Sequence, residues 1–162
     1  MLMREKLIEL LQENARLSNE ELAIMLDTDP QTVEQEIRQL EKEGVIKGYS
    51  AIVNEELVNP DLVTAVIELR VTPQRNKGYE DIARTIMQYD EVESISLMAG
   101  AYDLSVTVKG ENVKEISKFV SQCLAPLAGV LSTSTYFVLK TYKEKGIVIE
   151  EEEKDERGYY FP

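Results

Sequence analysis

Two short helices joined by a turn of about three residues are the most constraining feature of the sequence. Ser18 and Glu21 form a capping box, in which each side chain accepts a hydrogen bond from a backbone N–H at the helix start. Asp29 is a good N-cap for the next helix, Pro30 suits its first position, and Gly44 marks its end. This spacing is typical of a helix-turn-helix, whose second helix is normally presented to the major groove of DNA.

The second of these helices, predicted over residues 30–43, has an apolar stripe and a polar pole. At about 100° per residue Val33, Ile37 and Leu40 lie on one side, which must face the other helices. The opposite pole contains no acid and consists of Gln31, Gln35, Arg38 and Lys42.

Glutamine pairs with adenine edges and arginine with guanine edges, while lysine reaches phosphates. We therefore predict a DNA-binding surface, although a merely solvated helix face is the alternative. The predicted DNA-binding residues are Gln31, Thr32, Gln35, Arg38, Gln39, Lys42 and Lys47.

The overall charge opposes contact with a polyanion. The chain has 18 basic and 30 acidic residues, which gives a net charge of -12. Residues 1–55 alone contain 6 basic and 12 acidic residues. Because sequence-independent attraction to phosphate is weak in such a protein, affinity must come from a few aimed contacts multiplied by oligomerisation.

The composition also excludes several kinds of site. The 162 residues include no histidine and one cysteine, Cys123, so histidine-based catalysis, cysteine metal clusters and an internal disulfide are impossible. We interpret Cys123 as a core residue and predict no catalytic residues, no metal and no cofactor. A small enzyme using paired carboxylates is the remaining enzymatic alternative, but no acid–base constellation can be identified by spacing.

The predicted compartment is the cytoplasm. No stretch approaches the roughly 20 apolar residues that cross a bilayer, and the N-terminus lacks the features of a secretory signal. We therefore predict no membrane partner.

Hydrophobic patterning divides the chain into two domains. Residues 1–53 read as three helices followed by a short strand or wing, and residues 54–61 read as a linker. Residues 62–142 give the order βαββαβ, with Leu104, Val106 and Val108 alternating against polar neighbours. The predicted fold class is α+β, a winged helix-turn-helix followed by a ferredoxin-like antiparallel sheet with two helices on one face.

Four segments in this order and at these separations resemble the Lrp/AsnC family of bacterial and archaeal transcription regulators. They are "ENARLSNEELA", "EGVIKGYSAIVN", "MAGAYDLSVTV" and "GVLSTSTYFVL", and the resemblance covers about residues 5–142. It implies a sequence-specific regulator whose partners are double-stranded DNA and a small-molecule effector, an amino acid or related metabolite, bound between subunits. It also implies a homodimer that assembles into a tetramer or octamer.

The resemblance places the effector loop at Gly100, Tyr102 and Asp103. Asp103 is expected to meet an ammonium group, and Thr133 and Thr135, on one face of the last strand, to complete the site. The alternative needs no ligand: Gly100 is a hairpin residue with positive φ, Asp103 supplies turn chemistry, and the threonines reflect β-propensity.

The chain departs from the family pattern in three places. Glu36 and Gln39 stand where basic residues are common, and no Asp precedes the first helix. Residues 143–162 form an acidic C-terminal tail with 4 basic and 7 acidic residues, which we interpret as disordered, or else as packed on a neighbouring subunit or a sheet edge. The alternative function is an acidic regulatory module that senses a small molecule without binding DNA.

Overall fold

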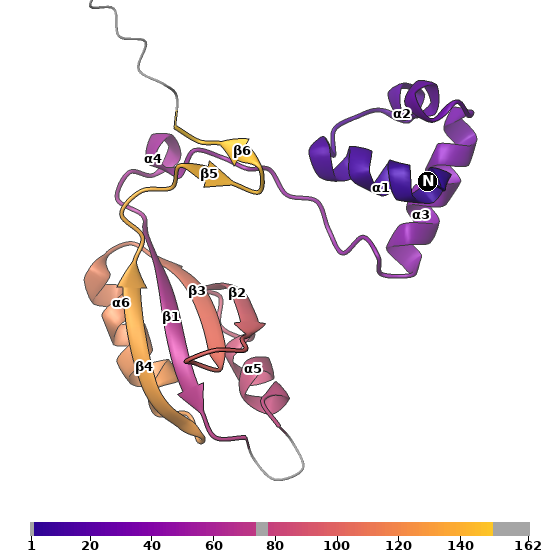
Figure 1. Cartoon of the computed structure of the whole chain (residues 1–162). Helices are drawn as coiled ribbons and strands as arrows, with labels where there is room; N and C mark the ends of the chain where they lie inside the picture. Colours follow the sequence, from indigo (N-terminus) through magenta and orange to yellow (C-terminus); the bar gives the residue numbers. More distant parts are fainter. Residues whose placement is uncertain (1, 74–77, 151–162) are drawn as a thin grey trace, which may run out of the picture. The chain divides into compact units, whose positions relative to one another are not determined.

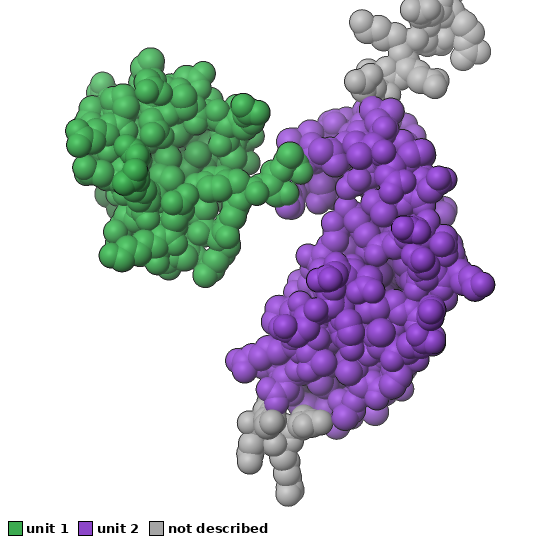
Figure 2. Space-filling view, turned by 180° about the vertical axis from the view of Figure 1, so that it is seen from behind, with its two compact units in different colours: residues 1–51 green, residues 52–162 purple. Residues whose placement is uncertain are grey.

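The computed structural model describes residues 2–73 and 78–150. The chain forms two compact units, Met1–Ala51 and Ile52–Pro162, which are coloured separately in Figure 2. The boundary falls just before the segment that was predicted as a linker.

Unit 1 consists of the helices α1 (Met3–Glu13), α2 (Asn19–Leu26) and α3 (Pro30–Lys42). Its core contains Leu7 of α1, Leu22 and Ala23 of α2, and Val33 and Leu40 of α3, all buried. Ile37 packs against this core and is partly buried. The predicted inward stripe of α3 is therefore confirmed.

The ends of α2 and α3 are fixed by the predicted capping residues. Ser18 Oγ accepts from Glu21 N at 3.1 Å, and Glu21 Oε2 accepts from Ser18 N at 2.8 Å. Asp29 Oδ1 accepts from Thr32 N at 2.9 Å. The Asp29 bond fixes the start of α3 at the turn that follows α2, and the Ser18–Glu21 box fixes the start of α2 at its other end.

A Schellman motif ends α3. Gly44 has φ +72°, Gly44 N donates to Glu41 O at 3.0 Å, and Val45 N donates to Leu40 O at 2.9 Å. The first helix is different, because Leu2 at its N-cap has no side-chain acceptor and only Leu2 N donates to Glu5 Oε2, at 3.2 Å. α2 and α3 thus begin at side-chain caps, whereas α1 has no side-chain acceptor at its N-cap.

The predicted strand of the wing is absent between α3 and α4 in the described residues. Val45, Tyr49 and Val53 are exposed there, and no second strand of unit 1 lies alongside to complete a hydrogen-bonded ladder. The expected short strand or wing therefore has no partner strand within the described part of this unit.

Unit 2 begins with a short helix where the linker was predicted. α4 (Glu55–Val58) is capped by Asn54, whose Oδ1 accepts from Glu56 N at 3.2 Å. Pro60 and the absence of periodicity suggested an irregular segment, but one Asn cap is sufficient for a single helical turn.

A four-stranded antiparallel sheet forms the body of unit 2. Its strands are β1 (Val63–Val71), β2 (Val92–Leu97), β3 (Leu104–Gly110) and β4 (Val130–Phe137), in the spatial order β2-β3-β1-β4. The helices α5 (Glu80–Ile86) and α6 (Val113–Phe119), with the π-helical turn η1 (Val120–Leu124), lie on one side of the sheet (Figure 1). This is the predicted ferredoxin-like arrangement.

The sheet has one covered and one open face. Leu69 pairs with Leu104 and Thr133, and Ile67 with Val106 and Thr135, so these side chains share the face that packs on the helices. The open face carries the alternate, mostly polar positions Val66, Glu68, Arg70, Ser105, Thr107, Lys109, Ser132, Ser134 and Tyr136.

The interpretation of residues 143–162 as a disordered tail is wrong for its first part. The strands β5 (Lys143–Glu144) and β6 (Ile147–Val148) pair in an antiparallel hairpin. Lys145 and Gly146 both have positive φ, as a two-residue type I′ turn requires. Asn54 Nδ2 donates to Ile149 O at 3.4 Å, which ties the hairpin to the start of α4. Residues 151–162 lie outside the described residues.

Candidate DNA-binding helix and effector loop

The acidic side chains of α3 and of its cap are all engaged within unit 1. Arg4 of α1 forms ion pairs with Glu36, whose Oε1 lies 3.5 Å from Arg4 Nη1, and with Glu43. Glu34 Oε1 accepts from Arg38 Nη2 at 2.5 Å, and Glu41 Oε1 accepts from Tyr49 Oη at 2.9 Å. Glu36, Glu41 and Glu43 therefore pair with residues outside the outward pole, whereas Glu34 pairs with Arg38 of the pole itself.

The pKa values follow these contacts. The hydrogen bond from Arg4 holds the pKa of Glu43 below its usual range, and Gln39 Nε2, which donates to Glu43 Oε1 at 2.6 Å, adds to this effect. The same bond raises the pKa of Arg4. Burial, followed by the bond to Glu41, raises the pKa of Tyr49. Glu36, which stands where a basic residue is common in the family, contacts α1 through the 3.5 Å ion pair with Arg4, and its buried Oε1 accepts no hydrogen bond from the described residues.

The outward pole of α3 is exposed. Gln31, Gln35 and Lys42 make no side-chain hydrogen bond with other described residues, and Arg38 is exposed over 74% of its side chain. The guanidinium of Arg38 has one bond to Glu34, so several of its N–H groups remain for a partner. The structure brings these four predicted residues to one surface.

The other three predicted DNA contacts have roles within the unit. Thr32 Oγ1 donates to Asp29 Oδ2 at 2.5 Å, which lowers the pKa of Asp29 and uses the hydroxyl in the cap. Gln39 is bonded to Glu43. A Cβ placed on Gly44 would lie 2.7 Å from Lys47 Nζ, so this ammonium lies near the C-terminal end of α3, where a cation is favoured.

The candidate effector loop joins β2 to β3 and is anchored on β1. Asp103 Oδ2 accepts from Val71 N at 2.8 Å, and Asp103 N donates to Leu69 O at 2.9 Å. Arg70 Nε donates to Ala101 O at 2.9 Å. Asp103 Oδ1 makes no hydrogen bond within the described residues, so one carboxylate oxygen is fixed and the other is left to accept.

Gly100 does not have the positive φ that was expected of a hairpin glycine. A Cβ at this position would meet nothing within 4 Å. Neither backbone conformation nor packing inside the chain therefore requires glycine at position 100, and the space beside it is open. The turn is closed by other bonds, such as Met98 N to Asp103 O at 2.7 Å.

Tyr102, Thr133 and Thr135 are half-buried. The two threonines do share one face of β4, as predicted, but it is the helix-covered face. Because β3 and β4 lie on opposite sides of β1, Thr133 is roughly 10 Å from the backbone of the loop, and Thr135 is further along the strand. The structure therefore brings Thr133 to the loop end of the sheet and places Thr135 further away.

Comparison with known proteins assigns both units. Residues 3–47 match the winged helix-turn-helix DNA-binding family, and residues 64–148 match the Lrp/AsnC ligand binding domain. The chain belongs to the Lrp/AsnC family of transcription regulators. It is a DNA-binding regulator with a ligand-binding domain, and the relatives described below are regulators, not enzymes.

Individual relatives extend over most of the chain. An HTH-type transcriptional regulator of Bacillus subtilis is 41% identical over 94% of this chain and 92% of its own length. The leucine-responsive regulatory protein of Haemophilus influenzae is 27% identical, covering 89% and 86%. Among solved structures, an L-Met complex of a transcriptional regulator from Neisseria meningitidis has a TM-score of 0.72 at 28% identity, covering 89% of this chain and 92% of that one.

Two features of this Lrp/AsnC chain were missed in the sequence. The pair Lys145-Gly146 between "KE" and "IV" is a hairpin signal that could have been found. The ion pairs of Arg4 join residues 32 and 39 positions apart, and no local pattern reveals them. In the described residues no cluster of three or more His, Cys, Asp or Glu can hold a metal, and no helix is long and apolar enough to cross a membrane.

Proposed function

We propose that this Lrp/AsnC regulator reads double-stranded DNA with Gln31, Gln35, Arg38 and Lys42 of α3. The observation that carries the proposal is the engagement of all four glutamates of α3 and its cap by partners in unit 1. The exposed amides suit adenine edges, and the guanidinium suits a guanine edge. Thr32, Gln39 and Lys47 support the helix ends, and Lys47 is close enough to the helix terminus to contact a phosphate as well.

The proposed effector is an amino acid at the loop that contains Gly100, Tyr102 and Asp103. Asp103 has a fixed carboxylate with one oxygen unoccupied, and the space beside Gly100 admits a ligand backbone. The L-Met complex of the Neisseria regulator supports this ligand class. Thr133 borders the same end of the sheet, and Thr135 lies two residues further from the loop along β4.

The proposed active form is a homodimer that assembles further to a tetramer or octamer in the cytoplasm. Two copies of α3 must be presented roughly 34 Å apart, or a multiple of it, to read successive major-groove faces. Because each chain has a net charge of -12, it gains little affinity from attraction to phosphate. The remaining affinity must come from avidity, that is, from several chains bound to the same DNA. Sedimentation should give a mass of at least twice the 18.4 kDa of one chain.

A fluorescence titration of the purified protein against DNA from upstream of its own gene tests the proposal. At about 50 mM salt we expect tighter binding to this DNA than to a scrambled fragment, because base contacts survive where phosphate attraction is weak. Addition of amino acids from a panel should change the affinity of the protein for this DNA. If the protein shows no sequence preference, with and without the panel, the alternative function is favoured: an acidic regulatory module that senses a small molecule without binding DNA.

A further inference from the structure

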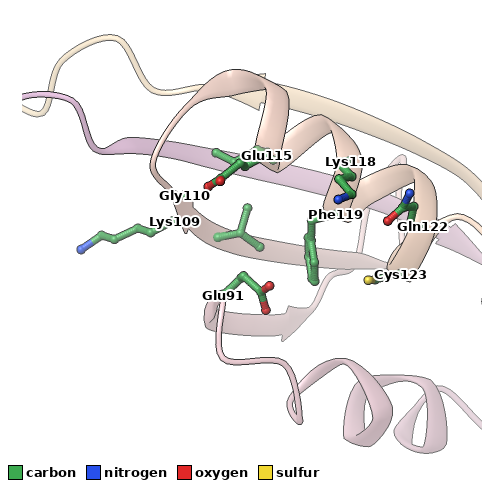
Figure 3. A pocket seen from close by; sticks show the side chains of 10 residues that line it. Glu91, Lys109, Gly110, Glu115, Lys118, Phe119, Gln122 and Cys123 are labelled. Carbon is green, nitrogen blue, oxygen red and sulfur yellow. The ribbon is translucent and has the colours of Figure 1, made fainter.

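A cavity of about 310 Å³ lies in unit 2 between the helix α6–η1, the end of β3 and the turn before β2 (Figure 3). β3 begins at Leu104 beside the effector loop and ends at Gly110 at the cavity. At about 3.3 Å per residue the two places are roughly 20 Å apart along the strand. The cavity is therefore a separate site.

The floor of the cavity is apolar and rigid. Val108, Ile116 and Phe119 line it and are at most 7% exposed. The ring of Phe119 packs edge-on against Tyr89 with centroids 5.3 Å apart. A Cβ at Gly110 would lie 2.9 Å from Ile116 Cγ1, so helix and strand are in close contact. Such a floor suits a short apolar group.

The rim of the cavity carries two charges without a partner. The side chains of Glu91, from the β2 side, and Lys118, from α6, make no hydrogen bond or ion pair with other described residues. Lys109 is different, because its Nζ lies 2.8 Å from Glu55 Oε1 and 2.7 Å from Glu93 Oε1. In Figure 3 its side chain extends away from the cavity.

Glu115 also lines the cavity, and its Oε2 accepts a hydrogen bond from Glu111 N at 3.3 Å, so this carboxylate adds a second negative charge that is held by the backbone. The charges that have no partner at all among the described residues are one negative, Glu91, and one positive, Lys118, on opposite walls.

The helix wall changes its winding at the cavity. α6 continues into η1, where Ala125 N donates to Val120 O at 2.8 Å, a π-type bond. Gln122 and Cys123 of this widened turn both line the cavity. Single π turns inside helices are uncommon and occur frequently at functional sites.

We propose that this cavity binds a small dipolar metabolite, with its ammonium beside Glu91, its carboxylate beside Lys118 and a short apolar body on Phe119. Opposite charges on the ligand complement the two free charges of the rim. Lys109 connects the site to the rest of the unit, because it lines the cavity and its ammonium holds Glu55 of α4. α4 directly follows the segment that connects unit 1 to unit 2. A ligand bound in the cavity can therefore act on that segment through Lys109, Glu55 and α4.

Alkylation of Cys123 tests the proposal directly. It is the only cysteine among the 162 residues and it lines the cavity. L-leucine, L-valine and L-methionine serve as probes, and intact mass spectrometry follows the rate of reaction with iodoacetamide. A probe present at about ten times its Kd should slow the reaction about tenfold, because only the unoccupied fraction reacts. Isopentylamine and 4-methylpentanoate, which each lack one charged group of leucine, should protect far less.

Variants separate this site from the effector loop. Glu91→Gln with Lys118→Gln should abolish protection, and Lys114→Gln, on the same helix but outside the lining, should leave it unchanged. Gly100→Thr, which obstructs the loop, should also leave it unchanged. Loss of protection in Gly100→Thr would assign the ligand to the loop and overturn the proposal.

Equilibrium dialysis with radiolabelled L-leucine, L-valine and L-methionine covers the case of a thiol that reacts slowly even without ligand. The Glu91→Gln, Lys118→Gln double variant should lose one bound molecule per chain relative to the wild type. Equal binding by the two proteins, or no binding by any of the three amino acids, would refute the cavity site. Neither result bears on whether α3 binds DNA.

Discussion

Gly44 is a residue whose identity is dictated by the backbone. Its φ of +72° allows the bonds that close α3, and an L-residue with a side chain is strained in that region. We expect Gly44→Ala to lower the free energy of unfolding of unit 1 by about 1 kcal/mol. Gly48→Ala is the control, because Gly48 has no positive φ and a Cβ there meets nothing within 4 Å.

Hydrogen exchange of the α3 amides measures the difference. Faster exchange in Gly44→Ala and wild-type exchange in Gly48→Ala would agree with a helix end fixed by the glycine. Equal exchange in both variants would contradict that role.

Gly100 presents the opposite case, because nothing inside the chain requires glycine. We expect Gly100→Thr to change the free energy of unfolding by less than about 0.5 kcal/mol, as for an ordinary surface substitution. It should nevertheless abolish the effect of amino acids on DNA affinity if a ligand approaches the loop backbone. Thermal unfolding and the DNA titration measure the two properties.

Gly129→Thr is the matched control for a structural glycine. Gly129 has φ +93°, and a Cβ there would lie 3.0 Å from Ile82 Cδ1 and 3.2 Å from Thr72 O. This variant should be clearly destabilised. A Gly100→Thr protein that is stable and still responds to amino acids would show that the effector binds elsewhere.

The contact between α1 and α3 depends on pH through Arg4. The pKa of Glu43 is lower in the folded protein than its value of 4.5 in the unfolded chain. The ionised carboxylate therefore stabilises unit 1 fully at pH values above 4.5. The stabilisation is lost as the pH falls through the lower folded pKa. We expect Arg4→Met to be less stable than the wild type at pH 7, and the difference to vanish at a pH below the folded pKa of Glu43.

Hydrogen exchange of α1 and α3 at the two pH values provides the measurement. Arg16→Met is the control, since the side chain of Arg16 makes no ion pair with other described residues and the variant should match the wild type at both pH values. A difference between Arg4→Met and the wild type that persists in acid would mean that packing, and not the ion pairs, holds these helices.

Elements with strong local signals were predictable, and elements that depend on distant partners were not. The Ser18–Glu21 box, the Asp29 cap and the alternation of β3 each contain their signal within a few residues. The expected wing strand did not form, because a strand needs a partner strand. The prediction of a disordered tail rested on its acidic composition and overlooked the Lys145-Gly146 turn, which joins the two strands of a hairpin. Part of the lining of the cavity comes from η1. Hydrophobic periodicity in the sequence does not reveal a single π turn inside a helix.

At the scale of the whole molecule, the net charge of -12 gives a misleading picture of α3. Its flanking glutamates are occupied by Arg4, Arg38 and Tyr49, which only the three-dimensional structure shows. The polar pole itself could be predicted from helical periodicity. The net negative charge that remains repels phosphate, so the protein should rely on base contacts and on several bound copies of α3.

The most direct test of this account compares Arg38→Ala with Arg84→Ala in fluorescence titrations of DNA from upstream of the gene. Both arginines are exposed and pair with a glutamate four residues earlier, but Arg84 lies on α5 of unit 2. We predict that Arg38→Ala loses about 1–3 kcal/mol of specific binding, whereas Arg84→Ala binds like the wild type. Wild-type affinity in Arg38→Ala would contradict the assignment of the outward pole of α3 as the DNA-reading surface.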